Sequence, residues 1–141
     1  MTDAQTVKQR FDVLEEFLEQ RLVGTHVDVR VERAFKAIEH SNGRLPMAQL
    51  ARECQISPRH LHRLVRKWVG MAPKRLARIV RFQAALKRME TAPAGDSQRI
   101  ATDLGYFDQA HLTNESTQLV RVSPARIVAH HVADFSKTRC D

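Results

Sequence analysis

The chain has 141 residues, enough for one compact domain or for two small lobes that share a long helix. Hydrophobic residues make up 43% and charged residues 28%, and no stretch of about 18 apolar residues is present, so the composition is that of an ordinary soluble protein without a membrane span. The net charge of +7 and the pI near 10.1 suit a polyanionic partner.

Apolar residues recur at helical spacing along almost the whole chain, and no segment shows the alternation expected of a strand. We therefore predict an all-α fold. In the first half, the expected helices are one at about 5–22 that ends at Gly24 and Thr25, one through Val31 and Ile38 that closes at Asn42-Gly43, a short one with Pro46 in its first turn, and one with Ser57 as N-cap and Pro58 at its first position.

The second half continues with the same signals. A long helix opens at Pro73 and runs to about residue 91, where a loop begins. After the loop we expect a short helix capped by Asp96 or Ser97, a helix from about Asp108 to Val120, and a last helix that starts at Ser123-Pro124. The total is about seven helices plus an extra N-terminal helix, followed by a frayed tail.

An internal repeat organises these helices into two similar units. Leu50-Ala51 recurs as Ile100-Ala101 fifty positions later, and Met71-Ala72-Pro73 recurs as Val122-Ser123-Pro124 after 51 positions. Each copy consists of a short helix, a tight turn, a second helix and a proline-started helix. This order is typical of a helix-turn-helix unit, in which the small alanines let the two helices cross closely.

The two units differ in the residue at the tight turn. This turn favours glycine, because the backbone there is left-handed. Gly105 meets this need in the second unit. Gln55 stands at the matching place in the first unit, where we expect a strain of about 1 kcal/mol.

The positive charge is concentrated in one stretch of the chain. Residues 55–90 hold ten basic and one acidic side chain, a net charge of +9, whereas the net charge is −2 over 1–24, +1 over 25–54 and −1 over 91–141. A localised field of this kind is typical of a protein that binds a polyanion such as DNA. The alternative is a solvated basic face without a partner.

The sequence resembles the AraC/XylS family of transcription regulators over roughly residues 30–128. The residues that carry the resemblance are Leu50-Ala51, 57–63, 70–73, 81–84, Ile100-Ala101, Gly105-Tyr106, Asp108-Gln109 and 122–124. The resemblance implies two helix-turn-helix subdomains of homeodomain-like, AraC type, joined by a long central helix. It also implies a regulator whose two recognition helices enter successive major-groove segments on the same face of the DNA.

By that resemblance, two sets of side chains would contact DNA. Base-edge contacts would come from Arg59, His62 and Arg63 in the first unit and from Gln109, Thr113 and Asn114 in the second, and phosphate contacts from Arg66, Lys67, Lys74 and Arg75. Arginine pairs with guanine, Asn and Gln pair with adenine, and Thr contacts the thymine methyl group. Arg63 is the strongest candidate, because it shares a helix face with Arg59.

Four positions depart from the usual pattern of that family: Asn114 replaces arginine, Ser116 a buried phenylalanine, Arg121 glycine and Val65 phenylalanine. A serine in a phenylalanine-sized site predicts a cavity that costs about 3 kcal/mol. The second lobe is therefore expected to be less stable and to be the weaker reader of DNA. Arg81 is expected to pair with Asp103 or Asp108 as a link between the lobes.

The other polar residues do not indicate catalysis or metal binding. Cys54 and Cys140 are far apart and outside any CxxC, so we expect neither a disulfide framework nor a zinc site, and a reducing cytoplasm is the simplest setting. Neither of the histidine pairs, His60-x-His62 and His130-His131, has supporting ligands nearby. We therefore expect no metal, and the proposed function needs no cofactor. We also expect no enzymatic activity, because Asp108, His111 and Ser116 do not form a credible triad. Cys54 and Trp68 are expected in the core.

The expected organisation is a connector helix at 1–24, a first lobe at 25–72, a linking helix at 73–91, a second lobe at 92–135 and a tail at 136–141. We expect double-stranded DNA and RNA polymerase as partners. The helix at 5–22 packs on the first lobe, pairs with a second copy as a homodimer, or is a remnant. The alternative functions are a low-specificity DNA-binding protein and a protein-interaction or anti-repressor module.

Overall fold

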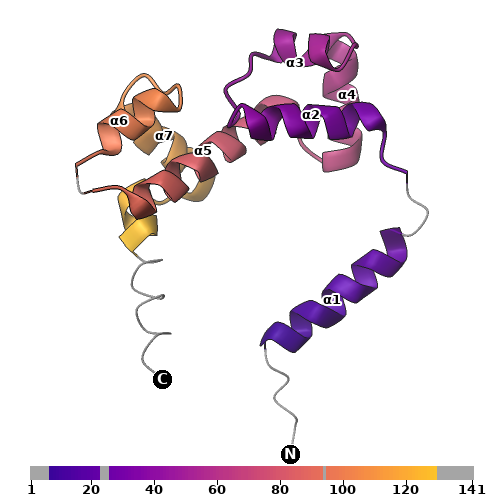
Figure 1. Cartoon of the computed structure of the whole chain (residues 1–141), viewed down its shortest axis with the longest axis horizontal. Coiled ribbons are helices and arrows are strands. Elements are labelled where there is room, and N and C mark those ends of the chain that lie inside the picture. Colours follow the sequence, from indigo (N-terminus) through magenta and orange to yellow (C-terminus); the bar gives the residue numbers. More distant parts are fainter. Residues whose placement is uncertain (1–6, 23–25, 94, 130–141) are drawn as a thin grey trace, which may run out of the picture.

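The structure is a computed structural model that describes residues 7–22, 26–93 and 95–129. All regular structure in these residues is helical, as the sequence predicts (Figure 1). The helices are α1 (Val7–Leu22), α2 (Val29–His40), α3 (Met47–Glu53), α4 (Pro58–Val69), α5 (Pro73–Thr91), α6 (Ser97–Asp103) and α7 (Gln109–Val120), followed by a short helix at 124–129.

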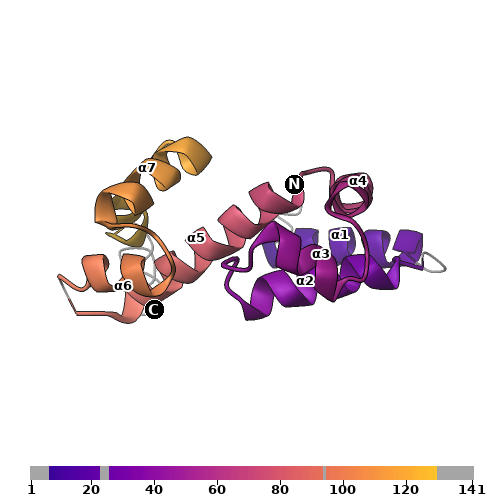
Figure 2. The ribbon, with the colours of Figure 1, turned by 90° about the horizontal axis from the view of Figure 1, so that it is seen from above.

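Two separate hydrophobic cores divide the helices into two lobes. The first core joins α2, α3, α4 and the start of α5, with Ile38, Leu50, Leu61 and Val65 almost completely buried. The second joins the end of α5 to α6 and α7, with Phe82, Ala85, Ile100, Leu104 and Leu112 buried. The long helix α5 runs from one lobe to the other (Figures 1 and 2). The predicted arrangement of two helix-turn-helix units on a long shared helix is therefore confirmed.

The two tight turns have the same backbone geometry. Gln55 has a φ of 57° and Gly105 a φ of 79°, so both are left-handed as predicted. In each copy the chain then folds back on the small alanine of the preceding helix. The Ile56 N–H donates to the Ala51 carbonyl at 3.1 Å, and the Tyr106 N–H donates to the Ala101 carbonyl at 3.0 Å. The sequence repeat is therefore also a repeat of hydrogen bonds.

The ends of the two second helices also correspond. Gly70 ends α4 with a φ of 76°, and Arg121 ends α7 with a φ of 63°. Each backbone N–H donates to the carbonyl four residues earlier, at 3.0 Å for Gly70 and 3.1 Å for Arg121. The left-handed conformation strains Arg121 by about 1 kcal/mol, whereas glycine adopts it freely. Arg121 thus stands where the resemblance leads us to expect glycine, the residue type that this turn favours.

The loop after α2 approaches α5 so closely that only glycine fits. Gly43 has a φ of 69°, and a Cβ atom at this position would lie 2.0 Å from the carbonyl oxygen of Ala77. Real Cβ atoms essentially never come within 3.0 Å of a heavy atom outside their own residue and its chain neighbours. This contact fixes the end of α2 against the linking helix.

The capping bond expected for α4 is present, and Asp108, where the sequence predicts the start of α7, makes one as well. The Ser57 hydroxyl accepts from the His60 N–H at 3.2 Å, and the Asp108 carboxylate accepts from the His111 N–H at 2.7 Å. Asp96 is the N-cap residue of α6, but its carboxylate accepts from the Arg99 guanidinium at 2.8 Å and makes no capping bond to the backbone. A local ion pair has replaced the backbone cap there.

Helix α1 does not pack on the first lobe, which was one of the three alternatives (Figure 1). Its large apolar side chains are 48–64% exposed, namely Phe11, Val13, Leu14, Phe17 and Leu18. An apolar stripe at this spacing normally lies against another protein surface. The fold of the two lobes is therefore complete without α1.

Candidate nucleic-acid interface

Helix α4 separates an apolar face from a basic face. Leu61 and Val65 are buried in the first core, whereas the side chains on the opposite face are exposed, namely Arg59, His62, Arg63, Arg66 and Lys67. Positions three and four residues apart lie on one side of a helix, so these five side chains form one surface. The fold therefore brings together the first-unit candidates for base contacts with two of the candidates for phosphate contacts.

The start of α5 adds two more exposed cations, Lys74 and Arg75, directly after the Gly70–Ala72 turn. Backbone N–H groups at a helix start attract anions, so this end of α5 also suits a phosphate. Among the described residues, no ion pair involves any basic side chain of α4 or these two. Their positive charge is thus uncompensated by neighbouring carboxylates.

Helix α7 presents a neutral polar surface instead. Gln109 and Asn114 are exposed and Thr113 is half-buried. The Thr113 hydroxyl donates to the Gln109 carbonyl at 3.0 Å. The Gln109 N–H donates to the Gln98 side-chain oxygen at 3.0 Å, which ties the start of α7 to α6. The amide side chains of Gln109 and Asn114 can exchange paired hydrogen bonds with adenine, but this face supplies no charge for phosphates.

Helices α4 and α7 lie on the same side of α5. Figure 2 shows α4 and α7 in the upper part of the view, near the two ends of α5, with α2, α3 and α6 in the lower part. The exposed candidate side chains of the two lobes therefore belong to helices that a single partner could meet on one side of the molecule.

A buried carboxylate that the sequence analysis missed joins α7 to α5. Glu115 is 5% exposed, and its Oε2 accepts from Arg78 Nε at 3.0 Å. Arg81 Nη2 lies 3.2 Å from each carboxylate oxygen. The Tyr106 hydroxyl donates to Oε1 at 3.1 Å, and Arg78 also donates to the side-chain oxygen of Gln118 at 2.8 Å. We call Glu115, Arg78, Arg81 and Tyr106 the Glu115 cluster.

The predicted pairing of Arg81 with Asp103 or Asp108 is therefore wrong. Glu115 takes Arg81 because it is buried on the inner face of α7, whereas the Asp103 side chain is 55% exposed and lies 3.7 Å from Arg88. The signal that could have found Glu115 is its position between Leu112 and Ser116, both buried on the apolar face of α7. A charged residue at such a position needs a partner inside the protein.

The Glu115 cluster also changes the chemistry of Tyr106. Burial is the largest cause that raises the pKa of the Tyr106 hydroxyl well above its ordinary value, and the negative charge of Glu115 raises it further. The hydroxyl therefore stays protonated and remains a hydrogen-bond donor to the carboxylate. The Arg81 guanidinium packs over the Tyr106 ring, 4.5 Å from its centroid.

Comparison with known proteins assigns this geometry to a family. A family model for a helix-turn-helix domain of AraC type matches residues 50–130, more than half of the chain. The chain belongs to the AraC-type helix-turn-helix family. This is a family of DNA-binding transcription regulators and not an enzyme class. No curated protein matches the chain.

Solved AraC-type domains share the fold. An AraC-type regulator from Chromobacterium violaceum has a TM-score of 0.64 at 18% identity, over 71% of this chain and 89% of its own. The C-terminal domain of AraT, a response regulator from Geobacillus stearothermophilus, has a TM-score of 0.64 at 22% identity, over 75% and 88%. The DNA-binding domain of AdpA, solved with a target DNA, has a TM-score of 0.64 at 24% identity, over 76% and 96%.

The AraC-type domain buries Ser116, at the position where the sequence predicts a phenylalanine-sized cavity. Ser116 is completely buried, and its hydroxyl donates to the Val122 carbonyl at 2.5 Å. The backbone after α7 occupies the space beside the hydroxyl. A serine here therefore replaces apolar contact with a hydrogen bond that ties α7 to the following turn.

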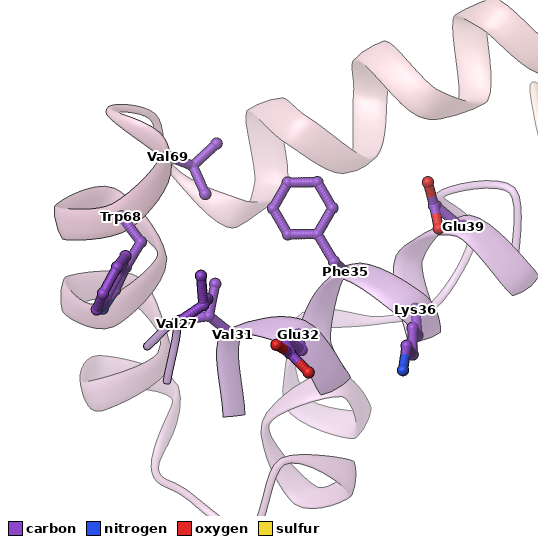
Figure 3. A pocket seen from close by; sticks show the side chains of 8 residues that line it. All are labelled: Val27, Val31, Glu32, Phe35, Lys36, Glu39, Trp68 and Val69. Atoms are coloured by element: carbon purple, nitrogen blue, oxygen red, sulfur yellow. The ribbon is translucent and has the colours of Figure 1, made fainter. Parts of the chain in front are cut away.

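Trp68 is not the core residue that the sequence indicates. It is 37% exposed and lines a hollow of 440 Å³ between α2 and α4. Figure 3 shows Trp68 and Val69 on α4 facing Val31 and Phe35 on α2 across this hollow. Cys54 lies in the first core as expected, and burial raises the pKa of its thiol.

Within residues 7–22, 26–93 and 95–129, no helix has the length and apolar content needed to cross a membrane. The same residues contain no group of three or more potential His, Cys, Asp or Glu metal ligands. His130 and His131, which the sequence analysis also considered, lie outside the described residues.

Proposed function

We propose that this AraC-type domain is a sequence-specific regulator of transcription that reads two adjacent major-groove segments, one with α4 and one with α7. The observation that carries the proposal is the uncompensated basic face of α4, on the same side of α5 as α7 (Figure 2). Double-stranded DNA is the partner that combines a continuous negative charge with two grooves on one face. The AdpA domain, which has a similar fold, was solved with a target DNA.

The exposed residues of each recognition helix have distinct roles in this proposal. Arg59, His62 and Arg63 contact base edges from α4, and Gln109, Thr113 and Asn114 contact them from α7. The phosphate contacts come from Arg66, Lys67, Lys74 and Arg75, which set the register without reading sequence. RNA polymerase is the protein partner, which the DNA-bound regulator recruits or blocks.

Substitutions in the two classes of contact should have different effects. Arg63→Ala removes a bidentate base contact, so we expect a loss of about 1–3 kcal/mol in binding and a relaxed preference at one base pair. Lys74→Ala removes a phosphate contact and should weaken all DNA sequences about equally. Titration of both variants against a preferred site and its single-base variants measures the difference. Equal weakening on every sequence by Arg63→Ala would show that Arg63 does not read a base.

Two other functions remain as alternatives and make different predictions. If the protein binds DNA with low specificity, unlabelled bulk DNA displaces a labelled site from it as readily as the same site without the label does. A protein-interaction or anti-repressor module keeps its function when the cations of α4 are removed. The specific reader is favoured because the basic face is restricted to one recognition helix, whereas α7 presents neutral amides at its exposed positions.

We further propose that the segment at 5–22 joins two copies of the protein. The support is the exposed apolar stripe of α1, which the two lobes leave uncovered. Leu14→Glu places a charge in this stripe and should shift the protein to the monomer in sedimentation equilibrium, whereas Asp12→Lys, on the opposite exposed face of α1, should not. A wild-type protein that sediments as a monomer at micromolar concentration contradicts the proposal.

A further inference from the structure

We propose that Glu115 is a positioning residue that holds the second recognition helix in one orientation to α5, and thereby sets the spacing between the two DNA segments that the domain accepts. This inference rests on the proposed two-segment reading and deepens it. Glu115 is buried, yet in this inference it helps to determine which DNA sites the domain binds.

The Glu115 cluster lies at the joint between the lobes. On α5, Leu76 and Ala77 belong to the first core, whereas Phe82 and Ala85 belong to the second. The two arginines that bind Glu115 lie in the short interval between these cores. A change in the angle of α7 to α5 therefore cannot occur without moving the carboxylate relative to Arg78 and Arg81.

The chemistry of the cluster makes it selective for one orientation. An apolar contact tolerates small sliding, but a buried carboxylate that loses its donors leaves an uncompensated charge, which is strongly unfavourable. Glu115 has donors from two other segments, the arginines of α5 and the hydroxyl of Tyr106 before α7. All of these bonds form together only when α7 has its observed angle and register on α5.

The other described link between the lobes is weaker. Arg44 Nη1 donates to the Asp103 carbonyl at 3.1 Å, and this bond is exposed to solvent. Hydrogen bonds at exposed positions compete with water and restrict orientation little. The buried carboxylate is thus the more selective of the two links.

The Glu115 cluster connects directly to the candidate DNA-contact residues. A hollow of 340 Å³ between α5 and α7 is lined by Arg78, Arg81 and Glu115 together with Lys74 and Asn114. Asn114 is the neighbour of Glu115 on α7, and Lys74 lies one turn before Arg78 on α5. A shift of the carboxylate therefore changes the distance between a proposed base contact of the second lobe and a proposed phosphate contact of the first.

The cluster has little capacity left for DNA phosphates. Two arginines share one carboxylate, and Arg78 is also engaged by Gln118. Arg81 is largely buried, at 18% exposure, with its guanidinium against the Tyr106 ring. Arg81 Nε has no hydrogen-bond partner among the described residues, but it is buried, and positioning uses the observed bonds as they are.

The test compares site spacing in the wild type, Glu115→Gln and a control. Glu115→Gln keeps the shape of the side chain and removes its charge. Asp103→Asn is the matched control, because it neutralises an exposed carboxylate of the same lobe that also faces an α5 arginine. Each protein is titrated against its preferred site and against sites with one base pair added or removed between the two segments.

We expect the wild type and Asp103→Asn to lose roughly tenfold or more in affinity when the spacing changes. Glu115→Gln should lose less than about threefold on the same change, with unchanged base preferences within each segment. A folded Glu115→Gln protein that is as strict about spacing as the wild type overturns the inference and leaves two-segment reading intact. A wild type that tolerates every spacing overturns both.

A second measurement makes the result independent of DNA. Spin labels on exposed positions of α3 and α6, introduced by Ala48→Cys and Thr102→Cys with Cys140→Ser, report the distance between the lobes in the free protein. We expect one narrow distance distribution in the wild type and a clearly broader one in Glu115→Gln. Equal widths in two folded proteins would contradict the positioning role, even if DNA affinity falls.

Discussion

Replacing Gly43 with alanine is expected to lower the free energy of unfolding by more than about 3 kcal/mol. The added Cβ would lie 2.0 Å from the Ala77 carbonyl oxygen, which belongs to the backbone of α5 and cannot rotate away. The φ of 69° adds strain for any residue with a side chain. Thermal and urea unfolding measure the loss, which should appear as a shift of the midpoint.

Gly70→Ala is the matched control for this experiment. Gly70 has a similar φ of 76°, but nothing lies within 4 Å of the position of its added Cβ. The substitution should therefore cost only the backbone strain, about 1 kcal/mol. If the two variants lose the same stability, the close approach of the loop at residue 43 to α5 is not present in solution.

Replacing Ser116 with phenylalanine is expected to destabilise the protein by about 3 kcal/mol. The resemblance alone predicts the opposite, because a phenylalanine usually fills this site in the family. In this chain Ser116 is completely buried and its hydroxyl donates to the Val122 carbonyl at 2.5 Å. A ring at this position would displace the turn after α7 and leave that carbonyl without its donor.

Ser116→Ala separates the two parts of that effect. It removes the donor without adding volume, so it should cost about 1–2 kcal/mol, less than the larger substitution. Thermal unfolding of both variants gives the comparison. A more stable Ser116→Phe protein would mean that the site can reopen to hold a ring and that the observed packing of the second lobe is not the one in solution.

Features that depend on neighbours in sequence could be predicted well. The Ser57 cap acts on an N–H group three residues away, and the prolines that start α4 and α5 fix the chain locally. The left-handed Gln55 followed from its place in the repeat. These signals determine where helices begin and end, which is why the two-unit architecture emerged from the sequence.

Features that depend on distant partners could not be predicted in the same way. Glu115 lies 34 residues from Arg81 and 37 from Arg78. From the sequence alone, several other acidic residues could have been the partner of these arginines. Burial decided the outcome, because a carboxylate on the inner face of α7 needs the arginines more than exposed Asp103 does. The sequence also did not indicate that Trp68 would line an open hollow, since large aromatic residues at helical spacing usually complete a core.

The measurement that tests the central claim most directly is selection of binding sites from random double-stranded DNA by the wild-type protein. Two-segment reading predicts an enriched sequence with two blocks about one helical turn apart. Arg63→Ala should relax the preference at a position in one block, and Asn114→Ala should relax it at a position in the other. An enriched sequence with a single block, or no enrichment above bulk DNA, would contradict the proposal that α4 and α7 together read one site.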